Sequence, residues 1–284
     1  MSHLPADTHL GYVNLRVPDV LPSLGFYREL LGFRVIREEE NLALLSASGH
    51  YPAQIILTGQ RGARRKPART TGLYHVAIRF GNRRALARVF RRLAEHGWPL
   101  HGNADHGVSE AIYLPDPDNN GVELYVDRAP EQWRYDENGQ VMMVTEALDI
   151  PDLLATAQDG APWDGIDPLT DIGHIHLQVS RLRDAEAFYC DILGLDVTQR
   201  SYPGALFVAA GGYHHHIGLN TWIGEGAPPP PPDSIGLIEY ALVIPAGWDA
   251  AVDRIQAAGG LVEDHPDGAV VRDPDGIGVV LVPG

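Results

Sequence analysis

Histidines mark the beginning of two strand-like stretches in this chain. In the stretch 72–80, alternation places His75 on one face of a strand and the largest apolar side chains on the other. The stretch 173–179 also reads as a strand and contains His174. Glu123 lies in the stretch 116–125, which follows the first strand and a helix. The chain has 13 histidines but only one cysteine. This composition points to a metal ion held by nitrogen and oxygen ligands rather than by sulfur.

The overall composition limits the classes of protein to consider. The chain has 284 residues, with 22 Lys and Arg against 37 Asp and Glu, which gives a net charge of −15. This acidic balance argues against a nucleic-acid partner, because phosphate binding needs a basic surface. No run of apolar residues is long enough to predict a membrane span, and the first nine residues lack a signal-peptide pattern. Cys190 cannot form an intrachain disulfide, which predicts a reducing, cytoplasmic location.

Four segments of the chain share one plan, in which a short strand is followed by an amphipathic helix and then by three strands. They run approximately over residues 11–60, 73–127, 173–222 and 237–282, and we call them modules 1 to 4. Modules 1 and 3 both carry an aromatic pair in the helix and a glycine after it, which we expect to adopt a left-handed conformation. Modules 2 and 4 share an Asp-Pro-Asp turn before the last strand.

This repeated unit, with a histidine on the first strand and a glutamate on the last, resembles the vicinal oxygen chelate superfamily. The stretches 105–111 and 212–222 look like its extradiol ring-cleaving branch, the catechol 2,3-dioxygenases of four-module form. The resemblance implies an α+β fold of four βαβββ modules that pair into curved half-open barrels. It predicts a first domain at residues 8–132, a connection at 133–170 and a second domain at 171–284.

The resemblance also implies where the metal lies, because in this superfamily two modules supply ligands from their first and last strands. Module 2 offers His75 and Glu123, and module 3 offers His174. Modules 1 and 4 carry Tyr12 and Glu239 at the histidine position. Only the pairing of modules 2 and 3 yields two histidines and one carboxylate. That set is associated with non-haem Fe(II) and oxygen chemistry, and Mn(II) is a second option.

Further polar residues in module 2 match the extradiol pattern in their order. By that resemblance, His106 would hydrogen-bond a substrate or a ligand, and Tyr113 would hold a substrate oxygen. Asp105 would orient His106 or another histidine. A core aromatic residue is the alternative interpretation for Tyr113.

Module 3 contains the run from His214 to His216, which we assign to its last strand. Alternation places His214 and His216 on the face of Gly218, which would leave room for a substrate ring. His216 is predicted to be the acid–base group because a histidine can exchange protons near neutral pH, and His214 is the second choice. His176 shares a face with His174 and is expected to line the pocket. A structural run that bonds backbone carbonyls is the alternative.

The predicted function is cleavage of a catechol, or of a substituted catechol or hydroquinone, by O2 next to the diol. The expected partners are therefore a small aromatic diol and O2, and the subunit number stays open, with a homo-oligomer as one option. A metal-dependent isomerase or lyase of glyoxalase type is an alternative, but such sites usually add a second carboxylate, and Gly218 stands at that place. A non-catalytic protein that binds aromatic compounds is a third interpretation, which the complete ligand set disfavours.

Overall fold

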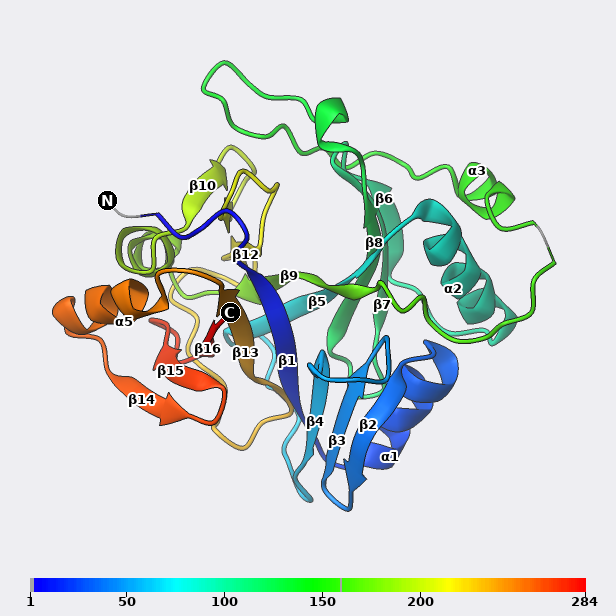
Figure 1. Ribbon diagram of the computed structural model, residues 1–284, viewed down its shortest axis with the longest axis horizontal. Coiled ribbons are helices and arrows are strands. Elements are labelled where there is room, and N and C mark those ends of the chain that lie inside the picture. The colour runs from blue at the N-terminus through cyan, green and yellow to red at the C-terminus, as the bar shows by residue number, and fades with distance from the viewer. Residues whose placement is uncertain (1–2, 159) are drawn as a thin grey trace.

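The strands form two eight-stranded sheets in the computed structural model, which describes residues 3–158 and 160–284 (Figure 1). The scaffold sheet has, in spatial order, β14 (Val262–His265), β15 (Gly268–Arg272), β16 (Gly278–Pro283), β13 (Gly236–Ile244), β1 (His9–Val17), β4 (Ile55–Gly59), β3 (Leu42–Ser46) and β2 (Arg34–Glu39). The site sheet has β10 (Asp196–Gln199), β11 (Ala205–Ala209), β12 (Ile217–Asn220), β9 (Asp171–Gln178), β5 (Gly72–Phe80), β8 (Gly121–Asp127), β7 (Ser109–Pro115) and β6 (Gly102–Asp105).

The helices are short and follow the first strand of each module. They are α1 (Val20–Leu24) with a π-helical turn at Gly25–Leu30, α2 (Arg83–Glu95), α4 (Leu182–Glu186) with a π-helical turn at Ala187–Ile192, and α5 (Trp248–Ala257). The connection adds a 3₁₀ turn at Pro130–Gln132 and α3 (Ile150–Ala155). The glycines predicted to be left-handed, Gly32 and Gly194, have φ values of 86° and 98°. No helix among the described residues is long and apolar enough to span a membrane.

The two sheets join the modules across the chain rather than in sequence order. In the site sheet, β5 of module 2 pairs antiparallel with β9 of module 3. In the scaffold sheet, β1 of module 1 pairs antiparallel with β13 of module 4. The α+β fold of four βαβββ modules is thus confirmed, as is the pairing of module 2 with module 3. The division into domains at residues 8–132 and 171–284 stays a prediction.

One hydrophobic core receives side chains from both sheets, whose central strands cross at a steep angle in Figure 1. Val76, Ile78 and Phe80 of β5 point into this core. Ala77 lies on the opposite face, where it contacts Ala111 and Tyr125. The alternation predicted for this strand is therefore confirmed, and it leaves the face of His75 free for a site.

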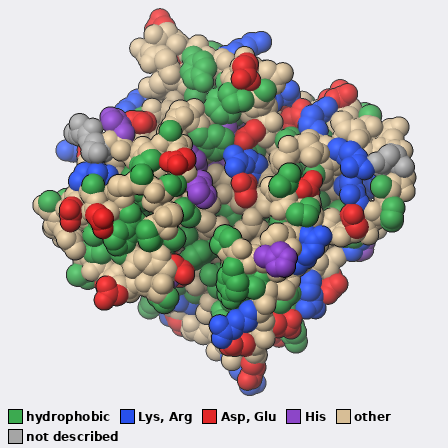
Figure 2. Space-filling model, in the orientation of Figure 1, with side chains coloured by type: hydrophobic (Ala, Val, Ile, Leu, Met, Phe, Trp, Pro, Cys, Tyr) green, Lys and Arg blue, Asp and Glu red, His purple; other side chains and the backbone are tan. Residues whose placement is uncertain are grey.

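Charged side chains of both signs are interspersed over the face of the molecule seen in Figure 2. No broad basic patch is visible on that face. This distribution matches the acidic composition of the chain and offers no footprint for nucleic acid there.

Two buried aspartates link neighbouring modules through the shared turn. Asp116 accepts hydrogen bonds from the backbone N–H groups of Asp118 and Asn120 in its own turn. It also accepts one from the Tyr27 hydroxyl of module 1 at 3.2 Å. Asp273 of module 4 does the same with the Tyr189 hydroxyl of module 3 at 2.9 Å. These contacts tie module 1 to module 2 and module 3 to module 4.

We expect these two carboxyl groups to weaken the fold as the pH rises. Burial raises the pKa of Asp116 and of Asp273 to about 6 each. A raised pKa means that the folded chain binds the proton more tightly than the unfolded chain does. The bound proton therefore stabilises the fold near pH 4, and this contribution to the unfolding free energy is lost as the pH passes 6. Asp116→Asn should reduce the change in unfolding free energy between pH 4 and 7 by on the order of 2 kcal/mol.

The measurement is urea unfolding across that pH range, with Asp7→Asn as a control at an exposed position. If Asp116→Asn and Asp7→Asn changed the pH dependence equally, the buried carboxyl would not be its source.

Candidate metal centre

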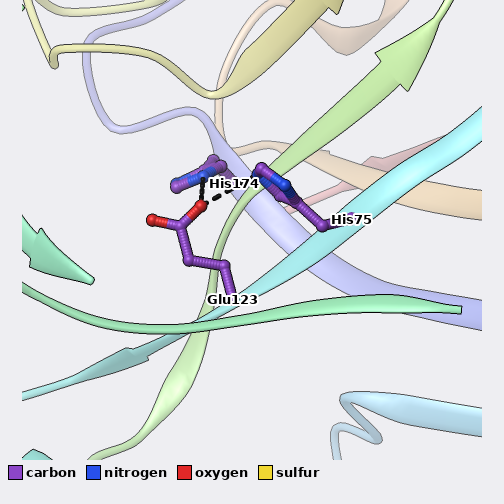
Figure 3. Close-up of side chains that lie close together, drawn as sticks. All are labelled: His75, Glu123 and His174. Atoms are coloured by element: carbon purple, nitrogen blue, oxygen red, sulfur yellow. Dashed lines mark hydrogen bonds and ion pairs between the residues drawn. The ribbon is translucent and has the colours of Figure 1, made fainter. Parts of the chain in front are cut away.

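Two histidines and one glutamate meet on the free face of the site sheet (Figure 3). His75 comes from β5, Glu123 from β8 and His174 from β9. In Figure 3 both imidazole rings lie against the same end of the glutamate side chain. The Glu123 Oε2 atom lies 2.9 Å from His75 Nε2 and 3.2 Å from His174 Nε2. The three ligand atoms all lie within 4.8 Å of one another.

The three side chains are almost completely buried, and burial shapes their charges. Their residues are 5%, 3% and 1% exposed for His75, Glu123 and His174. Burial raises the pKa of Glu123, but the two imidazoles outweigh it and hold the pKa well below its usual range. Burial lowers the pKa of His174 to about 4, against the opposing effect of Glu123. An ionised carboxylate beside a neutral imidazole is the protonation state that a metal ligand needs.

The donor set fits a divalent metal ion. The His75 Nε2 atom is buried without a hydrogen-bond partner among the described residues, although it lies next to Glu123. A buried nitrogen without a hydrogen-bond partner destabilises the fold unless another group, such as a metal ion, binds to it. Two imidazole nitrogens and one carboxylate oxygen on one side of an ion leave further positions open, as an oxygen-activating iron site requires. The cluster contains one carboxylate, not two.

A cavity of about 270 Å³ lies beside these side chains. Aromatic and apolar side chains form much of its wall, and neither lysine nor arginine is among its lining residues. It is lined by Tyr74, His75, Gly102, Asn103, Ala104, His106, Val108, Ser109, Tyr113, Glu123, Met143, Val144, Thr145, His176, Tyr202, Phe207, His215 and Trp222. The segment 143–145 belongs to the connection, so the wall is built from modules 2 and 3 and from the segment between them.

Three of the residues predicted to bind or convert the substrate line this cavity. The Tyr113 hydroxyl and His106 Nε2 are 2.7 Å apart, and His106 Nδ1 lies 2.7 Å from the Val144 carbonyl oxygen. Since Nδ1 donates to that carbonyl, Nε2 of a neutral His106 accepts from Tyr113. His176 is also at the wall, where Asn220 Nδ2 lies 3.1 Å from its Nε2. Gly218 leaves room for this ring, because a Cβ there would meet it at 2.9 Å.

The other three predicted residues lie elsewhere. Asp105 pairs with Arg128 and faces a separate surface cavity. His214 is fully buried, and its Nε2 lies 2.8 Å from Asp127 Oδ1. His216 accepts a hydrogen bond from the Ala210 N–H at 3.2 Å through Nδ1 and does not line the cavity.

The expectation that His216 would lie nearest the substrate is therefore not met by the geometry. The strand β12 begins only at Ile217, and the chain bends at His214 and His216. Alternation counted back from Gly218 does not hold across these bends.

His215 is the histidine of this run that reaches the cavity. Its ring centroid lies 4.1 Å from that of His174 and 4.9 Å from that of Phe207. Burial lowers its pKa well below the usual histidine value, which favours the neutral imidazole. The signal that could have found it was the triple histidine itself, but no periodicity decides which of three residues in a bent segment turns inward.

The comparisons with known proteins agree with this fold. The model of the Glyoxalase/Bleomycin resistance protein/Dioxygenase superfamily matches residues 9–124 and 171–281. The chain belongs to this superfamily.

Two curated relatives lie within the dioxygenases. The chain is 44% identical to the catechol-2,3-dioxygenase of Bacillus subtilis (strain 168) over 283 residues, which cover 96% of each chain. It is 31% identical over 118 residues to biphenyl-2,3-diol 1,2-dioxygenase 3 of Rhodococcus globerulus, covering 39% of this chain and 61% of that one.

Solved structures show the same fold at low sequence identity. Glyoxalase I from Zea mays has a TM-score of 0.58 and 18% identity, and the match covers 98% of this chain and 92% of that chain. A Bacillus subtilis protein has a TM-score of 0.66 and 14% identity, with coverage of 100% and 87%. At these identities the likeness concerns the fold alone.

Proposed function

We propose that this protein is an extradiol ring-cleaving dioxygenase that acts on catechol or a small substituted catechol with O2. The observation that carries the proposal is the cluster of His75, Glu123 and His174 beside an aromatic-lined cavity. The full-length similarity to a catechol-2,3-dioxygenase supports the same reaction. The single carboxylate of the cluster speaks against an isomerase site with a second acidic ligand.

The cavity suits one aromatic ring of this kind. An apolar cavity of about 150 Å³ is enough to bind benzene, so about 270 Å³ holds a catechol with a small substituent. Because neither lysine nor arginine is among the described residues that line the wall, no lysine or arginine cation there would balance an anionic substituent. The substrate we propose is therefore a neutral aromatic diol.

The proposed cofactor is Fe(II), held by His75, Glu123 and His174. When bound, Fe(II) supplies the redox chemistry by which the diol and O2 react together. The chain itself positions the ring between its aromatic walls and keeps bulk water away from the reaction. The Tyr113 hydroxyl donates to His106, and its oxygen can accept a hydrogen bond from a substrate hydroxyl.

His215 takes the acid–base role that was predicted for His216. Its ring lines the cavity outside the ligand cluster, and its centroid lies 4.1 Å from that of His174. A neutral imidazole can accept a phenolic proton from the diol and return it when the ring opens. His106 is held by hydrogen bonds at both ring nitrogens, and His176 is held at one. These two histidines serve to position groups in the cavity.

Oxygen uptake tests the proposed function directly. The full-length protein is loaded with Fe(II) without air, mixed with catechol and then exposed to oxygen in an electrode chamber. We expect one O2 consumed per catechol and a yellow ring-opened product. Binding of catechol without oxygen uptake by the Fe(II)-loaded protein would overturn the proposal.

Tyr113→Phe should weaken the reaction without emptying the metal centre. The variant removes the hydroxyl that lies 2.7 Å from His106 Nε2 and leaves that partly buried nitrogen without its partner. We expect kcat/KM for catechol to fall by about tenfold, which corresponds to about 1.4 kcal/mol. Steady-state kinetics with Tyr135→Phe, at an exposed tyrosine, provides the control. Equal kinetics for the two variants would remove the Tyr113 hydroxyl from the site.

A further inference from the structure

A chain of hydrogen bonds runs from a carboxylate at the edge of the site sheet to the imidazole in the cavity wall. Asp127 ends β8, four residues after Glu123 and on the same face of the strand. Its Oδ1 lies 2.8 Å from His214 Nε2, and His214 Nδ1 lies 2.8 Å from His215 Nδ1. Three side chains thus connect in one line, and the last of them reaches the cavity.

The proton positions along this line follow from the first group. Asp127 also receives hydrogen bonds from Arg79 at 3.3 Å and from the Tyr213 hydroxyl at 3.0 Å. Burial raises the pKa of Asp127, but His214, Arg79 and Tyr213 outweigh it and lower the pKa below the usual value. An ionised carboxylate can only accept, so His214 must donate from Nε2. In a neutral His214, Nδ1 then carries a lone pair and accepts from His215 Nδ1–H.

The His214 ring cannot easily turn away from this arrangement. Its residue has no exposed surface, and its ring packs against Tyr213 at 4.1 Å and Trp133 at 5.4 Å between centroids. The His214 carbonyl oxygen accepts from the Thr198 hydroxyl at 2.7 Å, which fixes the backbone. Packing and hydrogen bonding therefore hold the imidazole in one orientation.

We propose that Asp127 and His214 are positioning residues that fix His215 in the Nδ1–H tautomer, so that its Nε2 presents a lone pair to the cavity. His215 Nε2 has no hydrogen-bond partner among the described residues, and its ring lines the cavity wall. A lone pair at that atom is what a proton acceptor for a diol hydroxyl needs. The inference rests on the proposed function for its purpose, but the tautomer itself is a property of the chain.

Nitrogen NMR measures the tautomer without any turnover. The full-length protein is labelled with 15N-histidine and loaded with diamagnetic Zn(II), and His215 is assigned by the loss of its signals in His215→Gln. We expect long-range 1H–15N spectra to show a protonated Nδ1 and a lone-pair Nε2. In the protein without substitutions, an Nε2–H tautomer of His215 or two protonated ring nitrogens would overturn the proposal.

Asp127→Asn should invert the tautomer. Arg79 will hold the amide oxygen, so the amide NH₂ faces His214 and donates to its Nε2. His214 then carries its proton on Nδ1 and donates to His215, whose remaining proton moves to Nε2. With Fe(II) and catechol, we expect kcat to fall by about 10–100-fold with little change in KM.

Asp171→Asn is the matched control, because Asp171 binds the same Arg79 at 2.7 Å but is not a hydrogen-bond partner of His214. His214→Asn tests the same link if Asp127→Asn fails to fold, since its amide oxygen can still accept from His215 Nδ1–H and should preserve the tautomer.

The outcomes separate the two proposals. An unchanged His215 tautomer in Asp127→Asn, or an equal change in Asp171→Asn, would overturn the positioning role. An inverted tautomer with unchanged kcat would keep the positioning role and remove His215 from the reaction.

Discussion

Replacing Glu123 with glutamine is expected to empty the metal centre and abolish oxygen uptake. Glu123 is the only anionic member of the cluster, and both imidazoles face the same carboxylate oxygen. Glutamine has the same shape but no charge, so the loss concerns the ion rather than the packing. The iron content measured by elemental analysis after Fe(II) loading and desalting should fall from about one iron per chain to near zero, because the negative charge that binds the ion is gone.

His75→Ala and His174→Ala should lose the ion in the same way. Glu95→Gln, at an exposed position of α2, and His96→Ala, at the end of that helix, control for the loss of any carboxyl or imidazole group. Circular dichroism checks that each variant is folded. Normal iron content in all three site variants would reject the centre.

His215→Gln is expected to keep the ion and to lose turnover. The side chain lies outside the three ligands, but it is the neutral imidazole that we assign to proton transfer in the cavity wall. General acid–base catalysis by a positioned side chain is worth about 10²–10⁴-fold in rate, so kcat should fall by that range while iron content stays near the wild-type value. Single-turnover oxygen consumption by the iron-loaded variant is the measurement.

His216→Asn is the matched control for that experiment. Its amide oxygen can still accept from the Ala210 N–H, which preserves the hydrogen bond that His216 makes. We expect a small loss of kcat compared with His215→Gln. A larger loss in His216→Asn than in His215→Gln would return the acid–base role to His216.

The repeats allowed much of this architecture to be predicted. Strand alternation around His75 correctly separated the core face from the site face, because β5 pairs with β8 in an unbroken register from Val76 to Phe80 and one face is fully buried. The family resemblance implied that the metal ligands lie on the first and last strands of two modules. Because a repeated unit preserves register, the histidines and the glutamate at those positions could then be located in modules 2 and 3.

The parts that could not be predicted lie where the chain is irregular. The bends at His214 and His216 decide which histidine reaches the cavity, and no sequence period covers them. Met143 and Val144 reach the cavity from the connection, which has no regular strand there. Asp127 received no role from sequence, because its partner His214 is distant in the chain and the contact depends on how the site sheet assembles.

Anomalous X-ray scattering from crystals of the Fe(II)-loaded full-length protein would locate the metal ion among the side chains. We expect one strong iron peak per chain, bound by the Nε2 atoms of His75 and His174 and by the Glu123 carboxylate. An iron peak at another group of side chains, with these three residues left uncoordinated, would contradict it.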